Sequence, residues 1–207
     1  MNTAAEPRVT CSRIGGHVAL DLLNTVEWRL DSKQTIDDLT TYGQVLEWAR
    51  QAELINEREH DALRRVATEQ TQQADVELAA FQQLRETAYA ALVEREAAAV
   101  DEAVAQHRES LARAELQPVG NRWAWTEPAL ALTTPRDRAV RAVIDLLTSP
   151  EVAALHQCED VACGWVYLDT SPRRNRRWCV ATDCGNRNRA RRFYARQKEK
   201  SRGLERP

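Results

Sequence analysis

The chain has 207 residues, of which 43% are hydrophobic and 29% charged, and a formal net charge of −2, a composition typical of globular proteins with a substantial core. No stretch approaches the roughly 18 consecutive apolar residues of a membrane span, and the first residues, MNTAAEPRVTCS, lack the basic and apolar blocks of a secretory signal. We therefore expect a cytoplasmic protein that has no membrane partner.

Charge is divided unevenly along the chain. Residues 1–157 carry 16 Lys and Arg against 25 Asp and Glu, whereas residues 158–207 carry 13 against 6. An acidic body with a basic C-terminal part is typical of proteins whose basic part meets a polyanion. The two parts are therefore expected to have different partners.

The segment GGHVALDLLNTVEW predicts the first helix, over residues 17–28. Four polar or aromatic side chains would share one side of it: His17, Asp21, Asn24 and Trp28. With Trp123 or Trp125 as a wall, this stripe would line a pocket for a small-molecule effector. The alternative is that Asp21 and Asn24 cap neighbouring elements while His17 is half exposed.

Most of residues 35–116 is predicted to be helical. One helix at 40–53 follows threonines that can cap it, and Asn56 with Glu59 forms a capping box that opens the next. An apolar stripe from 74 to about 98 predicts a third helix.

A further apolar stripe, from Val100 to about 115, places His107 among Val104 and Leu111. No Cys, His or carboxylate stands at metal-ligand spacing from His107. We therefore expect a hydrogen-bonded core histidine at this position rather than a ligand.

At residues 117–134 large apolar side chains occur at every second position, which replaces the helical spacing. Trp123 and Trp125 alternate with small or polar residues, a turn with Pro128 follows, and Leu130 and Leu132 alternate after it. This pattern predicts a short β-hairpin with one buried face.

The next predicted helix, RDRAVRAVIDLLTS, follows Pro135 and carries its apolar side chains on one side. Pro150 and a cluster of cysteines come after it. We therefore divide the chain into an N-terminal helical domain, residues 1–150, and a small C-terminal module, residues 151–207.

Four of the five cysteines stand in two close pairs separated by 15 residues: Cys158, Cys163, Cys179 and Cys184. This spacing is typical of a tetrahedral Zn²⁺ site, and in a reducing compartment such clustering favours metal over disulfides. Four cysteine ligands leave no open position, so we expect one structural zinc ion per chain rather than a catalytic metal. Cys11, far from the others, is expected to be only a small residue near the N-terminus.

The spacer predicts a hairpin that brings the two pairs together. Residues 165–168 have strand-forming side chains, 171–175 can turn, and 176–178 can return as a second strand. Gly164 and Gly185 follow cysteines directly and would let backbone amides approach the sulfurs. A helix after Cys184 would complete a zinc-bound ββα module of treble-clef type.

The sequence after Cys184, GNRNRARRFYARQKEK, is compatible with this helix. Phe193 and Tyr194 fall near one side, and we expect their rings to dock on the zinc hairpin so that arginines project from a rigid element. Residues 173–198 contain ten basic residues, nine of them arginine, against Asp183 alone. This composition favours forked contacts with phosphate or base edges over generic solubility.

Two of these arginines have another expected use. A zinc ion with four thiolates is negatively charged, so Arg177 and Arg187 are predicted to stand beside the sulfurs. The others are predicted to contact nucleic acid, with Arg189 and Arg192 reaching base edges: Arg173, Arg174, Arg176, Arg189, Arg191, Arg192, Arg196 and Lys198. Scaffolding of protein or RNA and a merely solvated basic surface are the alternatives.

The C-terminal sequence C-x4-CGWVYLDTSPRRNRRWC-x4-CGNR-x-RARRFYAR resembles the CGNR zinc finger, named for the tetrad Cys184, Gly185, Asn186 and Arg187. The sequence GGHVALDLLNTVEWR at 15–29 is similar to the start of the ABATE domain that usually precedes that finger. The resemblance implies a bacterial, stress-induced transcription regulator with a zinc-dependent, DNA-binding C-terminus.

We therefore expect a mainly α protein, with a short β-hairpin in the helical N-terminal domain and a ββα zinc module at the C-terminus. The predicted function is regulation of transcription at the nucleoid through duplex DNA, with an N-terminal domain that senses a small molecule or forms a homodimer. An RNA-binding or ribosome-associated zinc protein is the alternative. An enzyme with its site in the N-terminal domain has less support, because no nucleophile motif surrounds His17 or Asp21.

Overall fold

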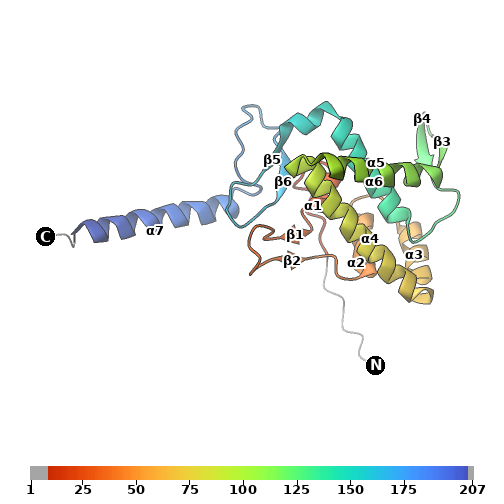
Figure 1. The fold of residues 1–207 in the computed structure, drawn as a ribbon, viewed down its shortest axis with the longest axis horizontal. Helices are drawn as coiled ribbons and strands as arrows, with labels where there is room; N and C mark the ends of the chain where they lie inside the picture. The colour runs from red at the N-terminus through yellow and green to blue at the C-terminus, as the bar shows by residue number, and fades with distance from the viewer. Residues whose placement is uncertain (1–8, 205–207) are drawn as a thin grey trace, which may run out of the picture.

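The structure is a computed structural model that describes the backbone of residues 9–204 and the side chains of residues 9–198. Helices predominate in it, which confirms the mainly α class (Figure 1). The α-helices of the described chain are α1 Val18–Leu23, α2 Tyr42–Gln51, α3 Glu57–Glu69, α4 Thr71–Tyr89, α5 Ala97–Ala112, α6 Thr134–Thr148 and α7 Cys184–Leu204. A π-helical turn, Ala90–Glu94, extends α4, and a 3₁₀ turn, Pro150–Ala154, follows α6.

The strands described form three antiparallel pairs. They are β1 Val26–Glu27 with β2 Ile36–Asp37, β3 Glu115–Val119 with β4 Arg122–Thr126, and β5 Leu155–Gln157 with β6 Val166–Leu168. Each pair is a small ribbon on a helical body rather than part of one sheet.

Helix starts follow the local signals in the sequence. Thr41 and Gln44 form a capping box at α2, and Asn56 and Glu59 form the predicted one at α3. Each box satisfies backbone N–H groups that the first helical turn leaves unpaired.

The main core lies between α2, α3 and α4. The Trp48 and Phe81 rings meet edge to face with centroids 5.7 Å apart, and Leu46, Leu63 and Leu84 are fully buried around them.

The buried face of α5 differs from the predicted stripe. Ala99 and Ala103 are buried, whereas Val100 and Val104 are only half-buried. The expectation of a hydrogen-bonded core histidine is also wrong, because the Nδ1 of His107 is buried without a hydrogen-bond partner. Small residues let α5 pack closely, which turns the larger side chains toward its flanks.

A second core joins α1 to the C-terminal part of the chain. Leu20 and Leu23 pack with Val143 of α6 and with Val166 and Leu168 of β6. Hydrophobic burial therefore runs continuously from the N-terminal helices into the zinc module.

Asn24 fixes this junction. Its side-chain amide donates to the Val166 carbonyl at 2.9 Å and accepts from the Val166 N–H at 2.8 Å. Because Asn24 is used in this way, α1 ends at Leu23 and the chain turns into β1. The helix predicted over 17–28 is therefore too long.

The β3–β4 hairpin corrects the prediction for residues 117–134. Trp123 and Trp125 pair with residues that precede them, across a turn at Gly120, and not with Leu130 and Leu132. Trp123 is 66% exposed, Trp125 is 46% exposed, and all of β3 is exposed, so the hairpin has no buried face. Alternation predicts a strand, but it does not say what covers the strand.

None of the helices within residues 9–204 combines the length and the apolar character that a bilayer span requires.

Replacing Asn24 tests the junction between α1 and β6. In Asn24→Ala the buried N–H and carbonyl of Val166 lose their partners, which is expected to lower the free energy of unfolding by about 2–4 kcal/mol. Asn175→Ala is the matched control, because Asn175 is exposed, and should change it by less than about 0.5 kcal/mol. Urea unfolding followed by circular dichroism measures both, and equal stabilities of the two variants would refute the role of Asn24.

Candidate metal centre and basic helix

Four buried thiols converge where β5, β6 and α7 meet. Their sulfur atoms all lie within 4.8 Å of one another, with Cys163 Sγ 3.6 Å and Cys184 Sγ 3.4 Å from Cys179 Sγ. The fourth is Cys158, which directly follows β5.

The sulfur positions fit a zinc ion and not disulfides. Disulfide sulfurs lie about 2.05 Å apart, whereas four sulfurs about 2.3 Å from a tetrahedral Zn²⁺ lie roughly 3.8 Å apart. The donor set is also right, since soft thiolates select zinc over hard cations. The predicted site for one zinc ion is confirmed, and it supplies structure rather than an open coordination position.

Thiol ionisation shows why a cation is needed here. Hydrogen bonds from Cys163 and Cys179 lower the pKa of Cys158 to about 2. Hydrogen bonding to Cys158 and burial raise the pKa of the Cys179 thiol, and burial raises that of Cys184. Four thiolates this close together would repel one another, so a site with all four ionised requires a dication among them.

The loop that carries the second pair of cysteines is held by side chains rather than by the predicted hairpin. Asp169 accepts from the backbone N–H of Ser171 at 3.0 Å and of Arg176 at 2.9 Å, and the Tyr167 hydroxyl donates to the Arg176 carbonyl at 2.8 Å. Residues 176–178 therefore form no strand, and β6 pairs instead with β5, upstream of Cys158. The sequence pattern places β6 correctly and assigns it the wrong partner.

The two glycines next to cysteines have a packing role besides the predicted one. Gly164 has φ +76°, and a Cβ there would lie 2.8 Å from the Cβ of Arg29. A Cβ at Gly185 would lie 3.1 Å from the Trp178 ring. Both glycines therefore admit neighbouring residues, and the backbone N–H of Trp165, directly after Gly164, donates to the Cys163 thiol as expected.

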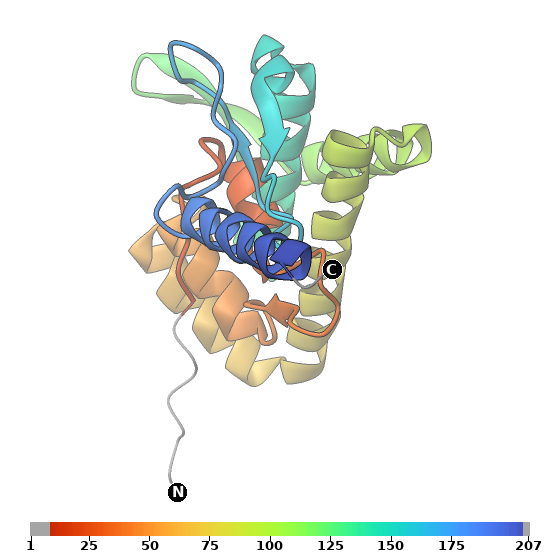
Figure 2. The same cartoon turned by 90° about the vertical axis from the view of Figure 1, so that its left-hand side faces the viewer.

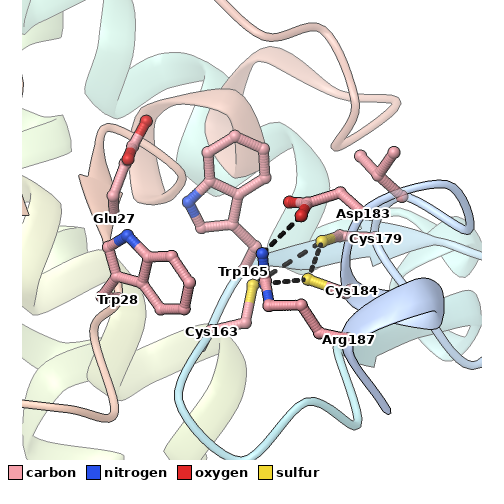
Figure 3. Close-up of a pocket in the computed structure, with 9 residues that line it drawn as sticks. Glu27, Trp28, Cys163, Trp165, Cys179, Asp183, Cys184 and Arg187 are labelled. Carbon is pink, nitrogen blue, oxygen red and sulfur yellow. Dashed lines mark hydrogen bonds and ion pairs between the residues drawn. The ribbon is translucent and has the colours of Figure 1, made fainter. Parts of the chain in front are cut away.

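The N-terminal part of the chain covers the metal centre. The N–H of Arg29 donates to the Cys163 carbonyl at 3.0 Å, and the Trp165 indole donates to the Val26 carbonyl at 3.2 Å. Figure 3 shows the Trp28 and Trp165 rings beside the sulfurs, where they line a cavity of about 80 Å³. Trp28 thus belongs to the surroundings of the metal and not to a pocket with His17.

Arg187 is the arginine that reaches a sulfur (Figure 3). Its Nη2 donates to Cys184 Sγ at 2.8 Å, its Nη1 pairs with Asp183, and its guanidinium lies 4.4 Å from the centre of the Trp28 ring. A cation on a thiolate offsets the negative charge of the site and orients the ligand. The predicted position of Arg187 agrees with this geometry.

Arg177 and Arg176 lie differently from the predictions. Arg177 pairs with Glu159 and sits over the Trp178 ring. Arg176, expected at nucleic acid, donates to the carbonyls of Trp178 and Cys179 at 3.1 and 2.6 Å and stacks on Tyr167 at 3.9 Å. Its donors therefore hold the metal loop.

Asp160 is a site residue that sequence reasoning missed. Its fully buried carboxylate accepts from the Ala162 N–H at 3.1 Å and lies 3.4 Å from Arg187 and 3.3 Å from Arg191. The available signal was an acidic residue between two ligands in an otherwise basic module, CEDVAC.

The helix α7 leaves the body directly after the metal centre. Cys184 and Gly185 are buried, but every side chain from Arg189 to Lys198 is exposed. Figures 1 and 2 show the helix projecting away from the other elements.

The predicted docking of the two aromatic rings is wrong. Phe193 is 52% exposed and Tyr194 69% exposed, and the two rings contact each other edge to face at 5.7 Å. The helix starts at the metal site with Cys184, and helical periodicity could not show that no other element covers Phe193.

The remaining residues predicted at nucleic acid are exposed. Arg173 and Arg174 lie in the loop before the second pair of cysteines, and the others lie along α7: Arg189, Arg191, Arg192, Arg196 and Lys198. The exposed basic residues thus stand on two elements of the C-terminal part, the loop before Cys179 and α7.

The predicted N-terminal stripe does not line one pocket. His17 Nδ1 accepts from the Ala19 N–H at 3.2 Å and Asp21 from the Gly15 N–H at 2.9 Å, while Asn24 is used at β6. Burial raises the pKa of Asp21. The alternative interpretation, capping of neighbouring elements, describes these side chains better.

Comparison with known families agrees with these observations. The ABATE family model, described as "Putative stress-induced transcription regulator", matches residues 16–150, and the CGNR zinc finger model matches residues 155–197. The predicted order of the two domains is confirmed. No curated protein matches the chain.

Substitution of one cysteine inside the cluster and one outside it tests the metal site directly. We expect about one zinc ion per chain by mass spectrometry under native conditions. Cys179→Ser should lose the ion and the ordered structure of the C-terminal module, whereas Cys11→Ser, whose residue lies outside the cluster, should keep both. Retention of stoichiometric zinc by Cys179→Ser would disprove a four-cysteine site.

Proposed function

Since the chain belongs to the ABATE family and carries a C-terminal CGNR zinc finger, we propose that it is a transcription regulator that binds duplex DNA through α7. The observation that carries this proposal is a long basic helix, fixed at one end by a metal site and exposed along residues 189–198. An α-helix about 10–12 Å across fits the major groove of B-DNA, which is about 12 Å wide.

The charges on the helix support contact with phosphates. Arg189, Arg192 and Arg196 lie on one side, three and four residues apart, and no acidic residue stands between Gly185 and Lys198 on the helix. Of the nearby carboxylates, Asp183 pairs with Arg187, and Asp160 lies between Arg187 and Arg191 at the metal site. The exposed guanidinium groups can therefore displace condensed counterions from DNA.

The loop before Cys179 offers a second contact. Arg173 and Arg174 are exposed on the metal loop, whose position is set by Asp169 and Tyr167. We propose that these two arginines bind phosphate beside the groove and fix the register of α7, while Arg189 and Arg192 reach base edges.

The exposed aromatic pair favours a second candidate, single-stranded or structured RNA. Phe193 and Tyr194 lie on the helix among the arginines, and unpaired bases stack on such rings. Duplex DNA remains the better fit, because a straight helix cannot read the deep and narrow major groove of A-form RNA.

We propose a binding role rather than a catalytic one, which the two family descriptions support. In this proposal the N-terminal domain senses a small molecule, and the contacts through Asn24 and Trp28 transmit the change to the zinc module. One helix covers few base pairs, so selective regulation would require two copies on one site.

Reversing three charges tests DNA binding. Arg189→Glu/Arg192→Glu/Arg196→Glu should abolish measurable binding to duplex DNA, and the wild type should lose affinity with salt at a slope of about 0.9 per phosphate contact on logarithmic axes. Fluorescence anisotropy at several salt concentrations measures both.

The matched control reverses three exposed arginines on α3, in Arg58→Glu/Arg64→Glu/Arg65→Glu. It makes the same change in net charge and should retain most of the affinity. Equal losses in both triple variants, or unchanged binding in the α7 variant, would rule out α7 as the contact. Tighter binding to structured RNA than to duplex DNA would favour the second candidate.

A further inference from the structure

A cavity of about 420 Å³ is lined by residues of α5, β4 and α6. Figure 1 shows β4 at the end of the body opposite α7. Its volume is in the range of about 300–1,000 Å³ that small-molecule sites occupy. The residues around it include His107, Trp125, Arg141, Ile144 and Asp145. No contact described above uses this cavity.

Two side chains at the cavity are incompletely hydrogen-bonded. His107 Nδ1 and Arg141 Nη1 are buried and have no partner in the described part of the chain. Buried polar atoms are almost always paired in folded proteins, so an unpaired one calls for a partner such as a water, an ion or a ligand. That two of them belong to residues lining one cavity indicates a ligand with hydrogen-bond acceptors.

Arg141 is held in place for such a role. Its Nη2 pairs with Glu127, whose carboxylate also accepts from Arg138, and Arg138 pairs in turn with Glu59. This chain of ion pairs fixes one side of the guanidinium group and leaves Nη1 unused. A forked donor with one free N–H suits an incoming carboxylate.

His107 adds an uncharged donor. Burial and the nearby Arg141 lower its pKa, so the imidazole is neutral at pH 7 and offers one N–H and one acceptor. The Thr148 hydroxyl is already bonded to the Ile144 carbonyl at 2.8 Å. The donors available to a ligand are therefore those of His107 and Arg141, once these side chains turn toward it.

Trp125 and Ile144 give the cavity an apolar wall. Trp125 is 46% exposed on a hairpin that has no buried face, so its ring is free to be covered. Aromatic groups pack on such a ring by stacking or by edge-to-face contact. The ligand would thus combine an acceptor at one end with a flat apolar body.

We propose that this cavity binds a small aromatic carboxylate, whose oxygens accept hydrogen bonds from Arg141 and His107 and whose ring packs on Trp125. Binding of the ligand does not depend on the proposed function. A regulatory role for the ligand rests on the proposed function, in which the N-terminal domain senses a small molecule.

The position of the cavity connects a bound ligand to the zinc module. Asp145 lines it and lies 3.7 Å from His17 Nε2, and His17 caps the start of α1. The other end of α1 is Asn24, which holds β6 of the zinc module. A ligand beside Asp145 would therefore change the contact with His17 and so affect α1, the helix that joins the two parts of the protein.

Calorimetric titration of the full, zinc-loaded chain with benzoate and with 1-naphthoate, without DNA, tests the binding. Both should bind, and benzyl alcohol, which lacks the carboxylate, should bind at least about tenfold more weakly. Absence of heat with both carboxylates at millimolar concentration, or equal binding of benzylamine, would overturn the proposal.

Variants locate the site. His107→Gln and Trp125→Ala should each weaken benzoate binding about tenfold, whereas Trp123→Ala on the same hairpin should leave it unchanged. Arg141→Lys, which keeps the charge beside Glu127 but loses the fork, serves as a second test if the Trp125 variant misfolds. Binding that none of these changes weakens would place the ligand elsewhere.

The effect of the ligand on DNA affinity is measured separately. Benzoate that binds in calorimetry and shifts the DNA affinity of the full chain supports a sensor. Benzoate that binds without any shift contradicts the sensing part of the proposed function and leaves the binding site standing.

Discussion

The architecture of the C-terminal part depends on one electrostatic constraint, the need for a dication among four buried sulfurs. The thiols lie within 4.8 Å of one another, too close for four negative charges without a metal between them. A zinc ion at this point joins the end of β5, the turn before β6 and the first residue of α7. Because a module of this size buries little apolar surface, the metal supplies stability that its core cannot.

The surroundings of the metal tie the zinc module to the helical body. Arg187 bonds a ligand sulfur and stacks on Trp28, which belongs to the N-terminal part of the chain. Asn24 completes the hydrogen bonding of β6 as a neighbouring strand would. A change in the packing of α1 therefore acts on both the core of the module and the residues beside its metal. Two parts that family comparison treats separately share one continuous interior.

Local chemistry was predictable from the sequence, and long-range pairing was not. The cysteine spacing predicted the metal site, and Asn56 with Glu59 predicted a helix start, because each signal lies within a few residues of its effect. The sequence did not predict that β6 pairs with β5. Asp169 and Tyr167 hold the following loop by hydrogen bonds to Arg176, so that loop does not return as a second strand. The sequence also did not predict that Phe193 and Trp125 are exposed. Periodicity shows which side chains share one face of an element, but not whether another element packs on that face.

If zinc makes the arginine-rich α7 a rigid element that binds DNA, as we propose, DNA affinity must depend on the metal. Duplex DNA affinity of the full chain is measured at one salt concentration before chelation, after chelation, and after zinc is restored. We expect a large loss of affinity on chelation and full recovery with zinc, because α7 begins at the ligand Cys184, whose sulfur Arg187 contacts. Unchanged affinity after the metal is removed would show that the basic sequence acts as a flexible tail, and would contradict the account.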